Sequence, residues 1–167
     1  MTEGPEPTGT LGDGPHGREL QLRRRFADSL DTVWAAMTDS TQLQKWIGRW
    51  EGDPASGKVI FLMTAAGEDA PPEECRILEC TPPQSLMVET SVGPDTWHLR
   101  FELSHDGGST TLLFAQRIGE DPLGSIGPGW EYYLDRLAAV LGGRDAGEVA
   151  WDHYYPALSE HYEQLGG

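Results

Sequence analysis

Five β-strand patterns follow one another in the middle of the chain, with only short connections between them. The segments are Lys58–Ala65, Cys75–Cys80, Leu86–Val92, Thr96–Ser104 and Ser109–Ile118. Gly93-Pro94-Asp95 and Asp106-Gly107-Gly108 have the composition of hairpin turns, and a Pro-Pro pair ends the second segment. Turns of this kind join neighbouring strands of a meander. The central part of the chain therefore predicts a β-meander.

A strand and two short helices are predicted before the meander. Apolar and polar residues alternate over residues 18–26, which indicates a half-buried strand. Asp28 or Ser29 can then cap a helix with the sequence DSLDTVWAAMTD, whose apolar residues follow helical spacing. Asp39 or Ser40 can cap a second, shorter helix.

A long amphipathic helix is predicted after the meander. Its apolar stripe consists of Ile126, Trp130, Tyr133, Leu134, Leu137, Val140 and Leu141. Gly127-Pro128-Gly129 lies near its start, and Gly142-Gly143 supplies the expected C-cap. A terminal segment follows, and we expect its stripe of Trp151, Tyr155, Leu158 and Tyr162 to pack onto the domain. Pro156 is expected to begin the last helical piece.

The chain divides into a tail and one domain. Residues 1–17 are rich in Gly, Pro, Thr and acidic residues and have almost no bulky apolar side chain. Such a segment cannot repay the entropy of ordering, so we expect a disordered acidic tail. Residues 18–167, including the C-terminal helical segment, are predicted to form a single domain, since 167 residues is a typical length for one domain.

The charge balance excludes several classes of partner. Twelve Lys and Arg against 27 Asp and Glu give a net charge of −15. We therefore expect neither nucleic acid nor an anionic membrane as a partner, because phosphate binding needs clustered cations. No apolar run approaches the ~18 residues that span a bilayer, and no signal sequence opens the chain.

The two cysteines predict neither a disulfide nor a metal site. Cys75 and Cys80 lie five residues apart, and on a regular strand an odd separation points side chains to opposite faces. The chain has no CxxC or HxxxH pattern, so no metal and no cofactor is expected. Two free thiols fit a reducing cytoplasm.

Four segments carry a family resemblance, and they occur in the expected order. They are RRRFADSLDTVWAAMTDSTQLQKWIG at Arg23–Gly48, ILECTPPQSLMVETS at Ile77–Ser91, LSHDGGSTTLLFAQR at Leu103–Arg117 and GPGWEYYLDRLAAVLGG at Gly127–Gly143. In these segments the chain resembles the SRPBCC (START/Bet v 1-like) superfamily, and within it the homologues of the heat-shock-protein-90 ATPase activator C-terminal domain. The resemblance implies an α+β helix-grip fold. In that fold a curved antiparallel sheet wraps around a long C-terminal helix, with two short helices after the first strand.

The resemblance also implies a cavity between the sheet and the C-terminal helix. The side chains expected to line it are Trp46, Phe61, Met63, Trp97, Phe101, Phe114, Trp130, Tyr133 and Leu137. Pockets for small ligands are mostly apolar and aromatic, with a few polar groups for orientation. Each of these residues could instead fill a solid core. As a set, six tryptophans in so short a chain favour a cavity wall.

Catalysis needs a titratable group held at the reacting atom, and the sequence offers two candidates for it. His98 is the histidine on a central strand, but its parity is opposite to that of Trp97, so it is expected to point away from the cavity. A bulge that shifts the register would turn it inward. Tyr133 could donate a hydrogen bond to a carbonyl group. No Ser-His-Asp order, phosphate loop or metalloprotease helix is present, so a non-enzymatic role is favoured.

Three functions remain open. We expect non-catalytic binding of a small hydrophobic ligand in the cavity. The family resemblance implies two alternatives: a co-chaperone-like interaction module for a heat-shock-protein-90 type ATPase, and a polyketide cyclase/aromatase-like enzyme. The acidic C-terminal segment could also form a homodimer contact. The basic triplet Arg23-Arg24-Arg25 is either a charged edge strand or a contact for an anion or acidic partner, and Arg24 shares the apolar parity of its strand.

Overall fold

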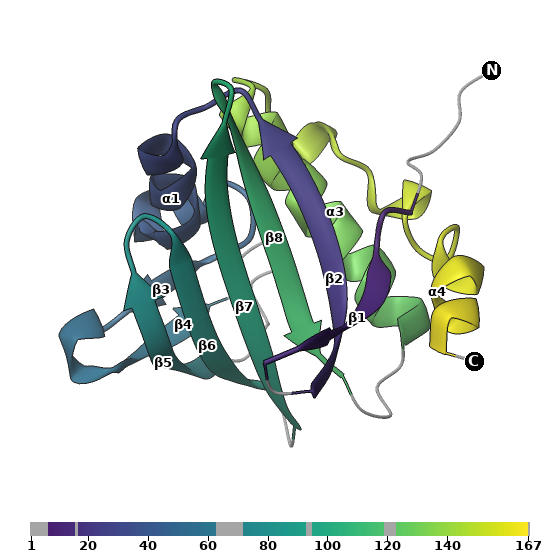
Figure 1. The fold of residues 1–167 in the computed structure, drawn as a ribbon, viewed down its shortest axis with the longest axis horizontal. Coiled ribbons are helices and arrows are strands. Elements are labelled where there is room, and N and C mark those ends of the chain that lie inside the picture. Colours follow the sequence, from purple (N-terminus) through teal and green to yellow (C-terminus); the bar gives the residue numbers. More distant parts are fainter. Residues whose placement is uncertain (1–6, 16, 63–71, 93–94, 119–122, 167) are drawn as a thin grey trace.

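The computed structural model describes residues 7–15, 17–62, 72–92, 95–118 and 123–166. Within these ranges, eight antiparallel strands form one curved sheet in the order β1-β2-β8-β7-β6-β5-β4-β3 (Figure 1). The strands are β1 (Thr10–Gly14), β2 (Gly17–Phe26), β3 (Arg49–Glu51), β4 (Lys58–Leu62), β5 (Glu73–Thr81), β6 (Ser85–Val92), β7 (Asp95–Asp106) and β8 (Ser109–Arg117). The helices are α1 (Leu30–Thr38), α2 (Ser40–Leu43), α3 (Leu123–Leu141) and α4 (Ser159–Gly166), with single 3₁₀ turns at Pro54–Ser56, Ala146–Glu148 and Trp151–His153.

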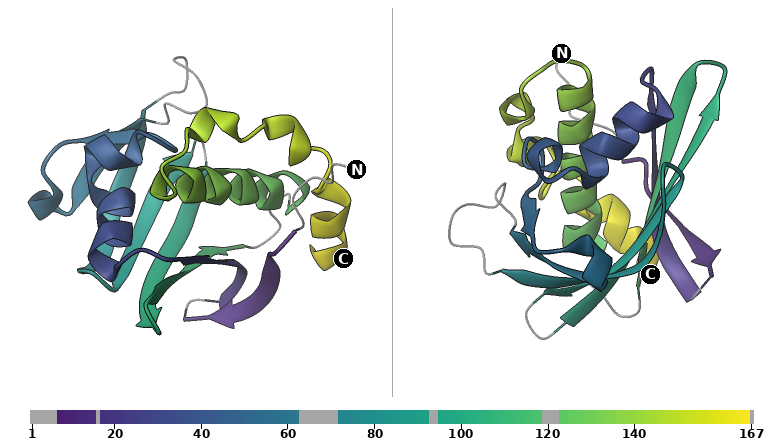
Figure 2. Two further views of the ribbon diagram at one scale, coloured as in Figure 1. Left: turned by 90° about the horizontal axis from the view of Figure 1, so that it is seen from above. Right: turned by 90° about the vertical axis from the view of Figure 1, so that its left-hand side faces the viewer.

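The predicted α+β helix-grip architecture is confirmed. Figure 2 shows α3 lying across the inner face of the sheet, with α1 and α2 near one end of it and α4 near the other. The predicted meander corresponds to β4 through β8, and the strand before the helices is β2. No helix in the described ranges combines the length and apolarity needed to cross a membrane.

The first two helices begin at capping residues that the sequence marks. The Ser29 side chain accepts a hydrogen bond from the backbone N–H of Thr32, and Asp39 accepts one from Thr41. Both caps satisfy N–H groups that have no partner within their own helix. They fix where the chain turns after β2, and so place Met37 and its neighbours over the sheet.

The N-terminal segment differs from the disordered tail predicted for residues 1–17. Thr10–Gly14 forms β1, which pairs in antiparallel register with β2, and residues 1–6 and 16 lie outside the described residues. The prediction considers only apolar side chains, whereas this segment is held by hydrogen bonds of its backbone and of the Thr8 hydroxyl. The β1 ladder and the N–H groups of Thr8 and Gly9 all find partners in the domain.

Helix α3 begins at Leu123, so Pro128 lies inside the helix and not at its start. A proline within a helix leaves the carbonyl four residues earlier without its usual donor. Here that carbonyl belongs to Gly124, and it accepts a hydrogen bond from the Ser159 hydroxyl of α4 at 2.7 Å. The packing of α4 therefore compensates for Pro128.

The C-terminal segment packs on the domain through a different set of residues from the one predicted. Leu158 and Tyr162 are buried as expected, but Trp151 and Tyr155 are 41% and 40% exposed, and Tyr154 is buried in their place. Helix α4 begins at Ser159, three residues after the predicted start at Pro156. The reason is that short 3₁₀ turns precede α4, so the regular helical spacing assumed from the sequence does not hold there.

Tyr162 is fully buried and lies between two glycines from distant parts of the chain. A Cβ atom added to Gly9 would lie 2.5 Å from the Tyr162 hydroxyl oxygen, and one added to Gly127 would lie 2.3 Å from the Tyr162 ring. Carbon atoms in contact need about 3.5–4.0 Å. Glycine at both positions thus allows the ring to reach the interior.

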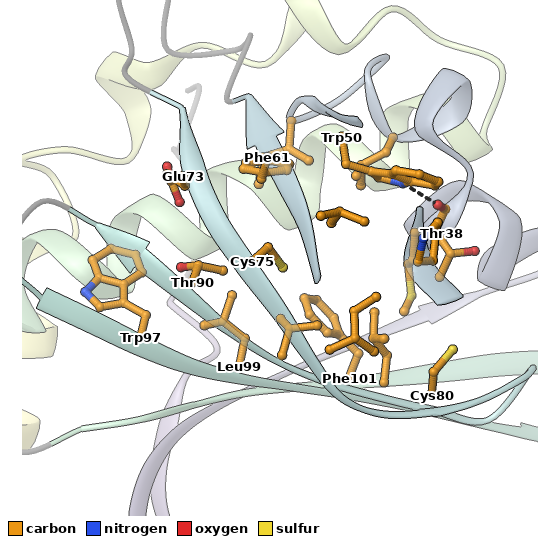
Figure 3. Close-up of a pocket in the computed structure, with 18 of the residues that line it drawn as sticks. Thr38, Trp50, Phe61, Glu73, Cys75, Cys80, Thr90, Trp97, Leu99 and Phe101 are labelled. Carbon is orange, nitrogen blue, oxygen red and sulfur yellow. Dashed lines mark hydrogen bonds between the residues drawn. The ribbon is translucent and has the colours of Figure 1, made fainter. Parts of the chain in front are cut away.

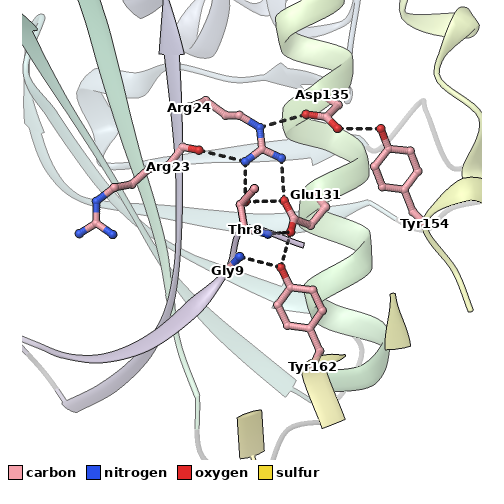
Figure 4. A network of polar contacts seen from close by, with 8 residues as sticks. All are labelled: Thr8, Gly9, Arg23, Arg24, Glu131, Asp135, Tyr154 and Tyr162. Atoms are coloured by element: carbon pink, nitrogen blue, oxygen red, sulfur yellow. Dashed lines mark hydrogen bonds and ion pairs between the residues drawn. The ribbon is translucent and has the colours of Figure 1, made fainter. Parts of the chain in front are cut away.

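A buried polar network joins the N-terminal segment, β2, α3 and α4 (Figure 4). Arg24 donates to Glu131 at 2.7 Å and to Asp135 at 3.0 Å. Glu131 also accepts hydrogen bonds from the Thr8 hydroxyl at 2.7 Å, from the Thr8 backbone N–H and from the Tyr162 hydroxyl. The acidic partners of Arg24 therefore belong to the protein's own long helix.

The network keeps Glu131 ionised although its side chain is only 1% exposed. Burial raises the pKa of Glu131, but hydrogen bonds from Tyr162, Arg24 and Thr8 outweigh it, and the pKa lies below its ordinary value. Burial and the charge of Glu131 together raise the pKa of Tyr162, which keeps its phenol neutral as a donor.

Replacing Glu131 tests this network. Glu131→Gln leaves Arg24 without its most buried charge partner, and we expect the free energy of unfolding to fall by at least about 2 kcal/mol at pH 7. The loss should shrink in acid, because Glu131 contributes its stability above the ordinary pKa of 4.5 and loses it as pH falls through its lower folded-state pKa. Urea unfolding at pH 7 and pH 3 measures both. The exposed control Glu148→Gln should change stability by less than about 0.5 kcal/mol, and equal losses in the two variants would contradict the assignment.

Two glycines of α3 should respond in opposite directions to the same substitution. Gly127→Ala forces a Cβ into the Tyr162 ring, so we expect a loss of about 1–3 kcal/mol in thermal or urea unfolding. Gly129→Ala meets no atom within 4 Å, and a helical alanine should raise stability by about 0.5–1 kcal/mol. Two changes of the same sign would contradict the packing described here.

Candidate functional site

A cavity of about 310 Å³ lies between the concave face of the sheet and the segment that runs from α1 to β3 (Figure 3). Trp130 of α3 forms a further part of its wall. The lining residues are Met37, Thr38, Leu43, Trp46, Ile47, Trp50, Pro54, Val59, Phe61, Glu73, Cys75, Ile77, Cys80, Leu86, Val88, Thr90, Trp97, Leu99, Phe101 and Trp130. Most are aromatic or aliphatic, as is typical of sites for small organic ligands.

The sheet side of the cavity is built from cross-strand rows. Residues opposite one another on antiparallel strands point to the same face, so the register of β4 to β7 decides which side chains reach the cavity. The rows are Val59-Cys75-Thr90-Trp97, Ile77-Val88-Leu99 and Cys80-Leu86-Phe101.

A β-bulge in β5 brings the two cysteines to the same face. The pairing with β6 shifts between Ile77 and Glu79, which leaves Leu78 as an extra residue. Cys75 and Cys80 consequently both line the cavity, and the sequence prediction that they point to opposite faces is wrong. Both thiols are free.

Four tryptophans line the cavity, and three of them have their polar N–H groups bonded to the protein. Trp46 donates to the carbonyl of Ala36 at 2.8 Å, and Trp50 donates to that of Thr38 at 2.8 Å. Trp130 donates to the Gln116 side chain at 2.7 Å. These bonds fix the indole rings, so the rings offer apolar surface to a ligand and no free donor.

The polar groups of the cavity are few and lie toward its ends. Figure 3 shows Glu73, Thr90 and Trp97 at one end, and Thr38 and Cys80 at the other. Burial raises the pKa of the half-buried Glu73 carboxyl. Burial and the charge of Glu73 raise the pKa of Cys75 to about 11. Cys75 is therefore a neutral thiol at pH 7 and a poor nucleophile.

The structure brings five of the nine predicted cavity residues together around this space: Trp46, Phe61, Trp97, Phe101 and Trp130. Phe114 is fully buried behind Trp130, whose ring lies 4.1 Å from it between centroids. Leu137 is fully buried and Tyr133 packs edge-on against Trp130, but neither lines the cavity. Met63 lies outside the described residues.

His98, the histidine singled out as an acid–base candidate, lies on the outer face of the sheet. Its Nδ1 atom is 3.3 Å from a carboxylate oxygen of Glu89, and it borders a small hollow with Leu78 and Arg100. The alternating parity of β7 holds at this position, because Trp97 and Leu99 on either side of His98 both line the cavity. The other candidate, Tyr133, has a pKa raised by burial and contacts Trp130 outside the cavity lining.

Several lining residues were not predicted; Glu73 carries a partial signal in the sequence, and Trp50 carries none. Glu73 has the same parity as Cys75 and Ile77, but the pattern around it reads as a turn. Trp50 lies in the three-residue strand β3, which is too short to recognise by alternation. The Ser40 hydroxyl holds it in place by bonding both the N–H and the carbonyl of Trp50 at 3.0 Å.

Comparison with known structures supports the fold over nearly the whole chain. CalU16 from Micromonospora echinospora is 26% identical, with a TM-score of 0.75, and the match covers 96% of each chain. A conserved protein of unknown function from Enterococcus faecalis is 20% identical, with a TM-score of 0.71, over 95% of this chain and 90% of that one. DynU16, a protein in the dynemicin biosynthetic locus, is 20% identical with a TM-score of 0.67, over 77% of this chain and 49% of its own.

Comparison with curated proteins finds no match. Comparison with protein families matches residues 28–142 to the family described as "Activator of Hsp90 ATPase homolog 1-like protein". The match runs from the cap of α1 to the end of α3 and includes every residue that lines the cavity. The chain is thus a member of the Activator of Hsp90 ATPase homolog 1-like family, within the SRPBCC superfamily.

Proposed function

We propose that this protein binds a small, largely apolar molecule in the cavity between the sheet and the helices. The observation that carries the proposal is the cavity itself, with about 310 Å³ of space behind walls of aromatic and aliphatic side chains. Ligand pockets begin at about 300 Å³. Membership in an SRPBCC family agrees with a ligand-binding role.

Two features of the cavity wall, its bonded tryptophan N–H groups and the β5 bulge, shape the space that a ligand would fill. Protein interiors are normally close-packed, and empty apolar volume lowers stability. Here the N–H groups of Trp46, Trp50 and Trp130 are bonded behind the wall, and the β5 bulge redirects Cys80 toward the space. A ligand that displaces poorly bonded water from such a surface gains affinity from apolar burial.

The cavity favours this function over the two alternatives. A cyclase-like enzyme would need acid–base groups at the substrate. Of the two sequence candidates, His98 lies on the outer face and Tyr133 outside the lining, which leaves Glu73, at one end of the cavity (Figure 3), as the carboxyl group in the described wall. The family's description supports a role with the Hsp90 ATPase, but it points to no particular surface of this chain. An aromatic cavity is the specific feature, and it suits ligand binding.

Filling the cavity should abolish binding without unfolding the protein. Val88 lies in the middle of the sheet wall, so Val88→Phe places a ring where the ligand body would lie. Met87 is its neighbour in β6 and borders the outer face, which makes Met87→Phe the matched control. We expect the neutral fluorophore N-phenyl-1-naphthylamine to bind at least about tenfold more weakly to Val88→Phe and unchanged to Met87→Phe.

Fluorescence titration measures both affinities, and circular dichroism confirms that each variant is folded. Equal binding by wild type and Val88→Phe would show that the probe lies elsewhere and would contradict the proposed site. Failure of the wild-type protein to bind the probe would contradict it as well.

A further inference from the structure

Glu73 is out of place in an apolar cavity. Carboxylates are rarely buried unless a cation or several hydrogen bonds compensate them. Among the described residues, the cavity lining contains no Lys, Arg or His. The carboxylate therefore has no cationic partner in the wall, whereas the neighbouring Glu74 is exposed and lies 3.8 Å from the ammonium of Lys58.

Aromatic and hydroxyl groups share the Glu73 end of the cavity. Phe61 lies opposite Glu73 in the β4–β5 register, and Thr90 and Trp97 come from the next strands (Figure 3). Aromatic faces attract cations, and an acceptor oxygen beside them adds a directed hydrogen bond. This combination provides a binding site for an organic cation.

We propose that the ligand carries a protonated amine that pairs with Glu73, while its apolar body fills the remainder of the cavity. The inference rests on the proposed function and specifies the class of ligand. It disfavours fatty acids and other anionic amphiphiles, because a second carboxylate would repel the half-buried Glu73 carboxylate. The net charge of −15 also attracts cationic ligands to the protein and repels anionic ones.

Titration of Glu73 gives the interaction a pH dependence of known sign. Burial raises the pKa of Glu73, so acid neutralises it earlier than an exposed glutamate, and amine binding should weaken as pH falls through that raised value. The other titratable groups coupled to Glu73 are Cys75 on β5 and Tyr133 on α3. The pKa of each is raised, so both stay neutral at and below pH 7.

Three probes with one apolar body test the inference: 2-naphthylmethylamine, 2-naphthylmethanol and 2-naphthoate. Isothermal titration calorimetry on the full chain at pH 7 measures their affinities. We expect the amine to bind at least about tenfold more tightly than the alcohol, and the carboxylate more weakly than either. An alcohol that binds as tightly as the amine would overturn the inference.

Two glutamates that are adjacent in sequence supply a matched pair of variants. Glu73→Gln should remove the preference for the amine, with affinity for the alcohol unchanged, whereas Glu74→Gln should keep it, although both variants change the net charge by one. The alcohol titration shows that the Glu73→Gln cavity is intact. If both variants lowered the affinity for the amine equally, the preference would come from the overall charge of the protein, and the assignment to Glu73 would be overturned.

The same titrations separate the two proposals. If the alcohol binds and the amine shows no preference, the cavity is still a ligand site, and only the proposal of a protonated amine is overturned. Failure of the amine and the alcohol to bind would overturn both proposals. Repeating the amine titration at pH 5 should lower its affinity for the wild-type protein and leave that of Glu73→Gln unchanged. A pH effect that persists in Glu73→Gln would overturn the role of Glu73.

Discussion

The buried contact between Arg24 and Glu131 is the interaction on which the arrangement of the chain depends. It joins the C-terminal part of β2 to the middle of α3 across 107 residues, and Glu131 also receives hydrogen bonds from Thr8 and Tyr162. The Arg24 and Glu131 side chains are only 13% and 1% exposed, so each charge must offset the cost of removing the other from water. Trp130 is the residue before Glu131 in α3 and lines the cavity. Because the Arg24–Glu131 contact holds this part of α3 against the sheet, it also fixes the position of Trp130 along the sheet.

The shape of the cavity follows from two local departures from regular structure. The bulge at Leu78 changes which residues of β5 face inward, so the wall contains Cys80 and Leu86 in one row with Phe101. The short strand β3 carries Trp50 over the opposite side, held by Ser40 and Thr38. Both features place residues on the wall and so define the space between sheet and helices.

The sequence predicts the fold well because its signals are periodic. Alternation in β7 correctly separates Trp97, Leu99 and Phe101 from His98, and the Ser29 and Asp39 caps mark where α1 and α2 begin. Prediction fails where a single residue or a distant contact decides. One extra residue at Leu78 reverses the parity of Cys80, and the N-terminal strand is held by backbone partners that composition does not reveal. Phe114 has the correct strand parity but is buried behind Trp130, and Leu137 is buried on α3 without lining the cavity, which periodicity cannot show.

Two glutamates show how the same side chain takes different roles in one fold. Glu131 is fully buried and Glu73 is half-buried, yet the pKa of Glu131 is lowered and that of Glu73 is raised. The difference lies in their partners, since Glu131 receives hydrogen bonds from Arg24, Thr8 and Tyr162, and burial alone acts on Glu73. A carboxylate whose partners belong to the chain stabilises the fold. A carboxylate that faces a cavity without a cation in the described wall lowers the stability of the free protein, and a bound cation would restore that stability. For this reason we assign Glu131 a role in stabilising the fold and propose that Glu73 binds the ligand.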